Sequence, residues 1–597
     1  MAEVASLRPL AAVLVSALAI VPILLARDRP NVREGITMVA ALAKFGIVAS
    51  MVPGVLAGEV YVTRLGTLAT GIEATLRADT LGLLFGLLAS FLWIVTSLYS
   101  VGYMRGLDEH GQTRYFASFA ASLAAAVGVA FASNLLTLFV FYELLTVATY
   151  PLVTHDETDE ARAAGRKYLA YTFGGGVAVL AGSVLVFWLT GTTAFAPGGI
   201  EGLANADPVY ARTAFVLLAG GFGVKAALMP VHSWLPDAMV APTPVSGLLH
   251  AVAVVKSGVF GIARVVLDVF GPETVGDLGM GLPLAVVAAI TLLTASLIAL
   301  RKDNLKRRLA YSTVSQLSYI VLGLALLGDE ALVGGLLHIP AHAFMKLTLF
   351  FCAGAIHVET HTDDISNMAG IGARMPLTMA AFGVASLGMA GIPLVAGFVS
   401  KWYLLIGALD VGAAVFAVAL LISGVLNVAY FWPVVYQAFF ETPDDHDRKP
   451  LVSGPMGGRF AGAGAVPDGG KGEAGADGPD PVEADAAAEA GGPDAGTVGR
   501  PATDETTDGT AAGDERTGTA DRAEQSDDHA DEHAHHGGPP AGGWESRNWL
   551  GAESTWFMLG PILTAMAGSL ALGIAPRLFV FLRIVQEIVA GLAGVAG

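Results

Sequence analysis

Long apolar stretches recur along the whole chain, and no other feature of the sequence constrains its fold as strongly. A helix needs about 20 apolar residues to cross roughly 30 Å of hydrocarbon, and we count about fourteen stretches of this length. Hydrophobic residues make up 54% of the chain and charged residues 14%, a composition outside the range of soluble globular proteins. The sequence therefore predicts an all-α polytopic membrane protein. The predicted spans are 7–26, 36–56, 79–103, 115–133, 134–153, 168–190, 211–230 with a continuation to about 240, 247–269, 281–300, 310–327, 331–357, 376–409, 411–440 and 555–576.

The first span and the cysteine content exclude two other interpretations. Span 7–26 is expected to be a retained helix, because many spans follow it and it lacks a basic start and a clear small-residue cleavage site. Cys352 is the only cysteine and lies inside a predicted span, so neither a disulfide within the chain nor a thiolate-bound iron–sulfur cluster is expected. The glycines of FGGGV (173–177) suit close helix packing and lack the context of a nucleotide-binding loop. We predict no cofactor.

Most of the negative charge lies in one segment. Between Glu441 and Arg547 there are 24 Asp and Glu against eight Lys and Arg, in a chain whose net charge is −18. Residues 441–548 are rich in Gly, Pro, Ala and Asp and poor in aromatic residues, which predicts a disordered loop between the last two spans. Its acidity fits either a salt-rich cytosol or a solvated spacer. The histidines at 529, 533, 535 and 536 are expected to be solvated, with adventitious metal binding as a minor alternative.

Basic residues concentrate in alternate loops, which predicts the orientation. One set of loops holds Arg27, Arg29, Arg33, Arg105, Arg114, Arg162, Arg166, Lys167, Arg301, Lys302, Lys306, Arg307, Arg308 and Arg374. The opposite loops hold essentially Arg64 and Arg77. Because basic loops stay in the cytoplasm, both termini are expected outside and the acidic loop inside, provided that the number of spans is even.

A few ionisable residues lie inside the predicted spans, where each costs about 2.5–3.5 kcal/mol and so needs a reason. They are Glu143, Lys225, His250, Lys256, His338, His342, Lys346 and Lys401. We predict that these eight residues are the functional set.

Each member also has a structural interpretation. Lys256 and Lys346 could extend to an interface, as expected for Lys44 in the second span. Glu143 could pair with a lysine only for packing, and His250 could be a hydrogen-bonded core histidine. These alternatives stay open for single residues, but several such groups on separate spans favour a shared function.

Two spacings among these residues suggest how they work. His338, His342 and Lys346 recur every four residues, so they share one helix face that could hold a file of water. A zinc pair at His338 and His342 lacks a third ligand, and no metal is predicted. Glu143 and Lys225 can both stay ionised as a buried pair, so a proton that neutralises Glu143 would release the proton of Lys225 to the next base.

One motif occurs twice beside interrupted spans. GFGVK at 221–225 returns as GFVSK at 397–401, in the first case before Pro230 and Pro236 and in the second after Pro393. Proline frees backbone carbonyls inside a spanning helix. Paired broken helices are typical of transport sites built from internal repeats, although a five-residue match can arise by coincidence.

Four longer motifs carry a resemblance to a known family. They are PVHSWLPDAMVAPTPVSGLLHAVAVVKSGVFGIARVV (230–266), LAYSTVSQLSYIVLGL (309–324), HIPAHAFMKLTLFFCAGAIH (338–357) and MAGIPLVAGFVSKW (389–402). Together they resemble the antiporter-like subunits shared by Mrp-type Na+/H+ antiporters, respiratory complex I and membrane-bound hydrogenases, over roughly residues 80–440. The resemblance implies fourteen helices with two inverted five-helix repeats, helices 4–8 and 9–13, and discontinuous helices 7 and 12.

The resemblance also implies roles and domain boundaries. Glu143 and Lys225 match the helix 5 and helix 7 pair, Lys256 the central helix 8 lysine, the helix 11 residues His338, His342 and Lys346 a relay, and Lys401 the terminal residue of helix 12. Lys401 argues against one complex I subunit, which carries glutamate there, whereas the motif around 241–251 fits several subunit types. The expected domains are 1–110 (helices 1–3), 111–270 and 271–440 (the repeats), 441–548 (the loop) and 549–597 (helix 14 and the C-terminal segment).

These observations predict a proton-translocating, D-like subunit of a multisubunit monovalent cation (Na+)/H+ antiporter in the cell membrane. The alternative is a proton-pumping subunit of complex I or of a membrane-bound hydrogenase, so enzyme status stays open, with a secondary transporter favoured. The expected partners are other membrane subunits, H+, Na+ and the lipid bilayer, without nucleic acid.

Overall fold

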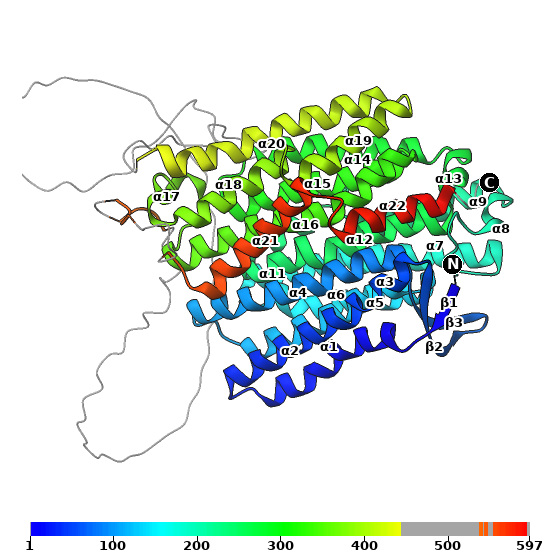
Figure 1. Cartoon of the computed structure of the whole chain (residues 1–597), viewed down its shortest axis with the longest axis horizontal. Coiled ribbons are helices and arrows are strands. Elements are labelled where there is room, and N and C mark those ends of the chain that lie inside the picture. The colour runs from blue at the N-terminus through cyan, green and yellow to red at the C-terminus, as the bar shows by residue number, and fades with distance from the viewer. Residues whose placement is uncertain (1, 443–536, 541–542, 547–552, 594–597) are drawn as a thin grey trace, which may run out of the picture. The chain divides into compact units, whose positions relative to one another are not determined.

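The computed structural model describes residues 2–442, 537–540, 543–546 and 553–593, all within one compact unit (Figure 1). Most of the expected acidic loop, 441–548, lies outside the described residues, so its disorder stays a prediction.

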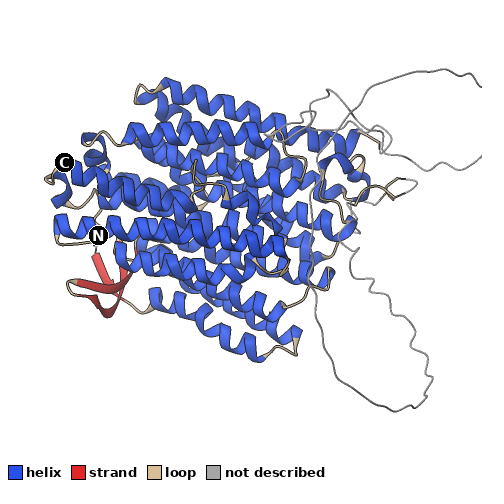
Figure 2. Ribbon diagram, turned by 180° about the vertical axis from the view of Figure 1, so that it is seen from behind, coloured by secondary structure: helices blue, strands red, loops and turns tan. Residues whose placement is uncertain are grey.

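Helices dominate the described chain and lie side by side with their axes roughly aligned (Figures 1 and 2). The longer ones are α1 (Arg8–Leu25), α2 (Pro30–Ala49), α4 (Thr80–Gly106), α5 (Gln112–Phe131), α6 (Leu135–Val153), α7 (Asp159–Thr190), α9 (Pro208–Lys225), α12 (Val254–Arg264), α14 (Gly281–Ala299), α15 (Leu305–Ala325), α16 (Asp329–Thr360), α18 (Pro376–Ala390), α19 (Ala396–Asp410), α20 (Ala414–Phe440), α21 (Trp556–Ile574) and α22 (Val580–Ala593). The short ones are α3 (Val52–Leu56), α8 (Glu201–Ala204), α10 (Trp234–Asp237), α11 (Thr243–Gly247), α13 (Pro272–Asp277) and α17 (Ile371–Arg374).

The helical membrane architecture predicted from the apolar stretches is confirmed. Ten helical segments among the described residues are long and apolar enough to cross a bilayer. Large apolar side chains such as Val39, Trp188 and Val425 are exposed on α2, α7 and α20, as expected where helices face lipid. The other predicted spans contain shorter or interrupted helices, so the total of fourteen crossings stays a prediction.

Local sequence signals explain where several helices begin. Asp79, Asn134 and Thr158 precede α4, α6 and α7, and the side chain of each accepts a hydrogen bond from a backbone N–H of the first turn. Such caps satisfy donors that have no partner inside the helix.

The two predicted helix interruptions are present. Helix α9 ends at Lys225, and helical structure resumes at Trp234 in α10, followed by a 3₁₀ turn (Ala238–Val240). Helix α18 ends at Ala390, where Gly391 takes φ +92°, and α19 begins at Ala396. Both copies of the Gly-Phe-x-x-Lys motif therefore lie next to a break.

The span between α9 and α14 is irregular as well. Two π-helical turns, η2 (Leu248–Val252) and η3 (Val265–Val269), flank α12. Single π turns inside helices often occur at functional sites, because they redirect side chains. His250 lies in η2, so its ring is carried by irregular backbone.

A small sheet was not predicted from the sequence. Strand β1 (Ala2–Ala5) pairs in parallel with β2 (Glu59–Ala69), and β2 pairs antiparallel with β3 (Ile72–Ala78), with Tyr61 opposite Ala78 (Figure 2). These strands lie in segments between the apolar stretches, where hydropathy carries no signal.

Helix α16 forms the core of the described unit. All its residues from Ala331 to Ile356 are buried, and it packs against α15, α18, α19, α21 and α22. Polar residues on this helix are thus enclosed by protein rather than by lipid.

Candidate functional site

The eight predicted residues come from six elements of the bundle. Glu143 lies on α6, Lys225 on α9, His250 on η2, Lys256 on α12 and Lys401 on α19, while the remaining three lie on α16. Lys225, His250, Lys256, His338, His342 and Lys346 have no exposed surface. None of the lysines on α12 or α16 extends to an interface, which excludes the snorkelling interpretation.

Lys225 is anchored beside Glu143. Its Nζ donates a hydrogen bond to the carbonyl oxygen of Tyr142 over 2.5 Å and lies 3.4 Å from the centre of the Tyr142 ring. A cation over an aromatic face gains electrostatic stabilisation, more so where water is absent. The ammonium group is therefore held at the residue that precedes Glu143 rather than on its carboxylate.

The Glu143 carboxylate packs against the glycines of α7. Neither of its oxygens, both buried, has a hydrogen-bond partner among the described residues. A Cβ atom on Gly176 would lie 2.0 Å from Oε1, so only glycine leaves room for this carboxylate. The close packing expected of FGGGV thus forms the wall of the Glu143 site.

Lys256 and His342 are in direct contact. Nζ of Lys256 lies 2.7 Å from Nδ1 of His342, a distance typical of a strong hydrogen bond. An ammonium donates to a bare ring nitrogen, whereas a neutral amine accepts from a protonated one. The contact therefore has two arrangements that differ by the position of one proton.

His338 continues the polar contacts toward α19. Its Nε2 lies 2.9 Å from Oε1 of Gln316 on α15, and its Nδ1 lies 2.8 Å from the Ser400 hydroxyl. The His338 and His342 rings are 6.1 Å apart between centroids. Because both nitrogens of His338 are engaged, the zinc-pair alternative at His338 and His342 is not favoured.

Lys346 lies one turn further along α16. Its Nζ donates to the Leu309 carbonyl over 2.9 Å and to the Ser312 hydroxyl, both on α15. The ring of Phe350 lies 5.9 Å from this Nζ, and the His250 ring lies 4.7 Å from the centroid of Phe350. Phe350 thus separates the two basic groups.

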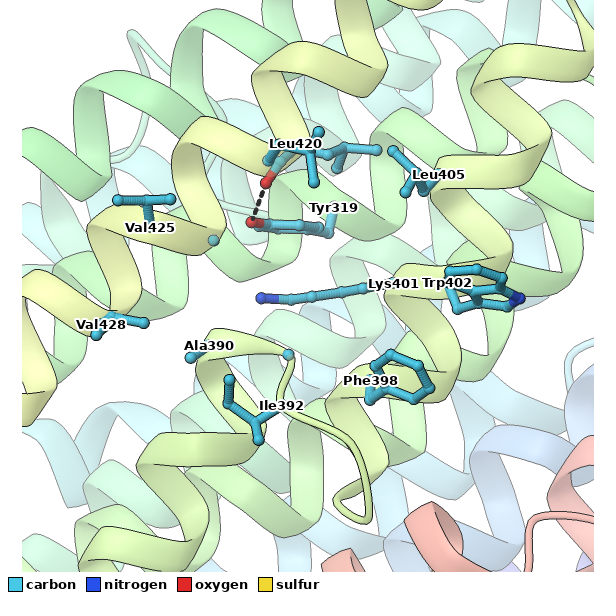
Figure 3. Close-up of a pocket in the computed structure, with 13 residues that line it drawn as sticks. Tyr319, Ala390, Ile392, Phe398, Lys401, Trp402, Leu405, Leu420, Val425 and Val428 are labelled. Carbon is cyan, nitrogen blue, oxygen red and sulfur yellow. Dashed lines mark hydrogen bonds between the residues drawn. The ribbon is translucent and has the colours of Figure 1, made fainter.

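Lys401 extends into a cavity of about 380 Å³ between α18, α19 and α20 (Figure 3). Its Nζ donates to the Met389 carbonyl over 2.5 Å and lies 4.6 Å from the Tyr319 ring centre. That carbonyl lies at the end of α18, where helix termination leaves acceptors free. The break between α18 and α19 therefore supplies the partner of this lysine.

Several further buried polar atoms near these residues have no hydrogen-bond partner in the described part of the chain. They include both ring nitrogens of His250, Nε2 of His342 and the Ser246 hydroxyl. A buried polar atom without a partner costs about 1–3 kcal/mol, and internal water is its usual partner.

Some contributors were missed from the sequence. Gln316, Ser312 and Tyr319 on α15 link or border the predicted residues, and Asn427 accepts a hydrogen bond from Gln316 over 3.1 Å. The polar run AYSTVSQLSY inside an apolar span was the available signal.

Lys44 differs from its expected place at an interface. It is fully buried, and its Nζ donates to the Leu123 carbonyl over 2.7 Å and lies 5.2 Å from the Trp93 ring.

Comparison with known proteins places this geometry. Residues 132–427, which include all eight predicted residues, match the family described as NADH:quinone oxidoreductase/Mrp antiporter, TM. The NADH-quinone oxidoreductase subunit N of Desulforudis audaxviator is 34% identical over 64% of this chain and 76% of that protein. The chain belongs to this family.

Other relatives in the family have different names. The Hydrogenase-4 component B of Escherichia coli is 33% identical over 58% of this chain, which spans 53% of that protein. A probable K(+)/H(+) antiporter protein of Rhizobium meliloti, its A/B component, is 33% identical over 69% of this chain, which spans 41% of that protein.

A solved structure shares the fold. A chain of the Mrp complex from Dietzia sp. DQ12-45-1b matches with a TM-score of 0.72 at 22% identity, covering 98% of each chain. The protein is thus an antiporter-like membrane subunit, and its relatives include antiporter, hydrogenase and oxidoreductase components.

Proposed function

We propose that this chain is the proton-translocating, D-like subunit of a multisubunit monovalent cation (Na+)/H+ antiporter of the Mrp type. Protons move along the basic file, which we define as Glu143, Lys225, His250, Lys256, His338, His342, Lys346 and Lys401. The observation that carries the proposal is the 2.7 Å contact between Lys256 and His342, two titratable groups without exposed surface. Such a contact stabilises either position of a shared proton, which a merely structural lysine does not need.

The entrance of the file acts as a charge switch. In the described state Lys225 bonds the Tyr142 carbonyl, and the neighbouring Glu143 carboxylate has no hydrogen-bond donor among the described residues. Protonation of Glu143 removes the negative charge nearest to Lys225, which weakens the hold of Lys225 on its own proton. That proton then passes toward Lys256.

Water completes the path between the direct contacts. Glu143, His250 and His342 all have buried polar atoms without a partner in the described residues. Water bound to these atoms joins α6, η2 and α16, and a hydrogen-bonded chain of water can transfer protons between the side chains. The file ends at Lys401, whose cavity opens beside α20 toward a neighbouring membrane protein of the complex.

A redox-driven complex is the second candidate. The similarity to subunit N extends over 76% of that relative, so the same file could be driven by electron transfer in partner subunits. The proposed placement in the cell membrane, with both termini outside and the acidic loop in the cytoplasm, is the same in both cases.

Cation-driven proton flux distinguishes the candidates. Everted vesicles that contain the chain with its partner subunits are given a pH gradient, and a pH-sensitive dye reports its collapse when Na+ or K+ is added. We expect collapse, its loss in Glu143→Gln and Lys225→Met, and its retention in Arg307→Gln, since Arg307 is exposed and pairs with Glu160 at 3.4 Å. Proton flux that responds to an electron donor and not to cations would favour the second candidate.

A further inference from the structure

A cluster of metal-ligating side chains lies outside the basic file, where two turns meet. Glu109 and His110 belong to the turn between α4 and α5, and His155 belongs to the turn after α6. One ligand atom from each of the three lies within 4.8 Å of the others. This cluster was not predicted, because Glu109 and His155 lie far apart in the sequence, with the whole of α5 and α6 between them, and meet only after folding.

His155 is buried in a way that its own surroundings do not satisfy. Its side chain has no exposed surface, and neither ring nitrogen has a hydrogen-bond partner in the described part of the chain. Its Nε2 lies 3.5 Å from a Glu109 carboxylate oxygen, and its ring lies 4.8 Å from the His110 ring. A buried imidazole aimed at a carboxylate and a second imidazole needs a further partner.

The geometry is close to that of a tetrahedral metal site. Zinc binds imidazole nitrogen and carboxylate oxygen at about 2.0–2.2 Å, so ligand atoms around it lie roughly 3.3–3.5 Å apart. The distance from His155 to Glu109 is 3.5 Å, and Nδ1 of His110 lies 4.0 Å from the same carboxylate oxygen. The His110 side chain is 53% exposed, so it can close the remaining gap without disturbing the core.

Both turns are held in place by contacts outside the cluster. Arg114 donates to the His155 carbonyl over 3.3 Å and pairs with Glu157. Gln112 donates to the Glu109 carbonyl over 3.0 Å. Ligands on backbone that is already fixed lose little entropy when they bind a metal.

We propose that Glu109, His110 and His155 form a binding site for a divalent zinc-type cation. Two imidazoles and one carboxylate suit Zn2+ better than Mg2+ or Ca2+, which prefer oxygen ligands. Exposure of His110 leaves the fourth position open to water. A bound ion would tie the end of α4 to the end of α6, the helix that carries Glu143.

The test measures Zn2+ binding rather than transport, so its result is independent of the proposed function. The purified full-length chain in detergent is titrated with Zn2+ against a chromophoric chelator, in a background where His529, His533, His535 and His536 are replaced by Asn. We expect one Zn2+ per chain in this background. X-ray absorption should report imidazole nitrogen and carboxylate oxygen at about 2.0–2.2 Å.

Three variants make the result specific. His110→Asn and Glu109→Gln change partly exposed side chains and should weaken binding more than the roughly 10–100-fold that loss of an outer-shell partner causes. His361→Asn, an exposed histidine elsewhere on the described surface, should bind as the background chain does. Absence of stoichiometric binding in the background chain, or equal binding in all three variants, would overturn the site.

Discussion

At the scale of single residues, two buried lysines show what distinguishes a structural cation from a functional one. Lys44 and Lys256 both lack exposed surface. Lys44 bonds a main-chain carbonyl, which cannot take up its proton under ordinary conditions, whereas Lys256 contacts the His342 ring, which can. Burial alone therefore does not identify the proton path, and the partner does.

The glycines of α7 provide a matched test of the Glu143 site. A Cβ atom on Gly176 would collide with the Glu143 carboxylate, whereas a Cβ atom on Gly174 would meet nothing within 4 Å. Gly176→Ala should displace the carboxylate and slow transport by roughly 10²-fold, as misplacement of a reacting group by about 1 Å can do. Gly174→Ala should leave the rate unchanged in the same vesicle assay. Equal rates in both variants would argue against a role for the carboxylate position.

Asp363, in the turn after α16, gives a pH-dependent prediction. Burial acts to raise the pKa of Asp363, but the hydrogen bond and charge of His357 outweigh it and lower this pKa below its ordinary value of 3.8. A carboxyl with a lowered pKa contributes stability above pH 3.8, and that contribution is lost as pH falls below this value through the folded pKa. The melting temperatures of the wild type and of Asp363→Asn should converge over that range. A difference that does not depend on pH would contradict the assignment.

The sequence predicted the ionisable members of the file but few of their contacts. Lys256, His338 and His342 were identified because charge inside an apolar span is costly. Gln316 and Ser400 were not, because neutral polar side chains are common in spans and become significant only when folding places them on His338.

At the scale of elements, a buried ionic cluster joins α4 to α12. The Arg264 guanidinium donates to both Asp79 oxygens, over 2.8 and 2.9 Å, and to Asp268 over 2.6 Å. Asp79 also caps α4 by accepting from the Gly82 N–H. The cluster therefore fixes the start of one helix against the end of another.

Breaking this cluster should destabilise the protein strongly. Arg264→Met leaves two buried carboxylates without their cation, which typically costs about 3–5 kcal/mol. The melting temperature in detergent should fall clearly, while exposed Arg162→Met, whose partner Asp159 is also exposed, should leave it within error. A wild-type melting temperature for Arg264→Met would show that the cluster contributes little.

Element prediction succeeded where sequence chemistry was strong. Pro230, Pro236 and Pro393 indicated both helix breaks, since proline cannot donate a helical hydrogen bond. The π turns and strands β1–β3 were not foreseen, because a π turn has no proline signature and the strands lie outside the spans. The inverted relation of the two proposed repeats, 111–270 and 271–440, stays a proposal.

At the scale of the whole molecule, part of the segment expected to be a loop contacts the bundle. The Trp544 indole N–H donates to the Ala369 carbonyl over 2.8 Å, and the Gly538 N–H donates to the Thr362 hydroxyl over 3.1 Å. The described residues between 537 and 546 therefore have a structural role that composition did not predict.

Deleting residues 450–530 should leave cation-driven proton flux largely unchanged, because this acidic stretch contains none of the basic file and spares the contacts of Trp544. Flux and complex integrity are measured on the same preparation by the vesicle assay and by size-exclusion chromatography. Dissociation of the complex would contradict the view of this stretch as a spacer.

The central claim is that protons pass through the basic file, and a comparison of two buried lysines tests it most directly. Cation-driven proton flux is measured for Lys256→Met and Lys44→Met, each replaced by an apolar side chain of similar length, with assembly checked in parallel. Loss of the titratable partner of His342 should reduce flux by about 10²-fold or more, the scale of general acid–base contributions, while Lys44→Met should retain it. Wild-type flux in Lys256→Met, in an assembled complex, would contradict the account.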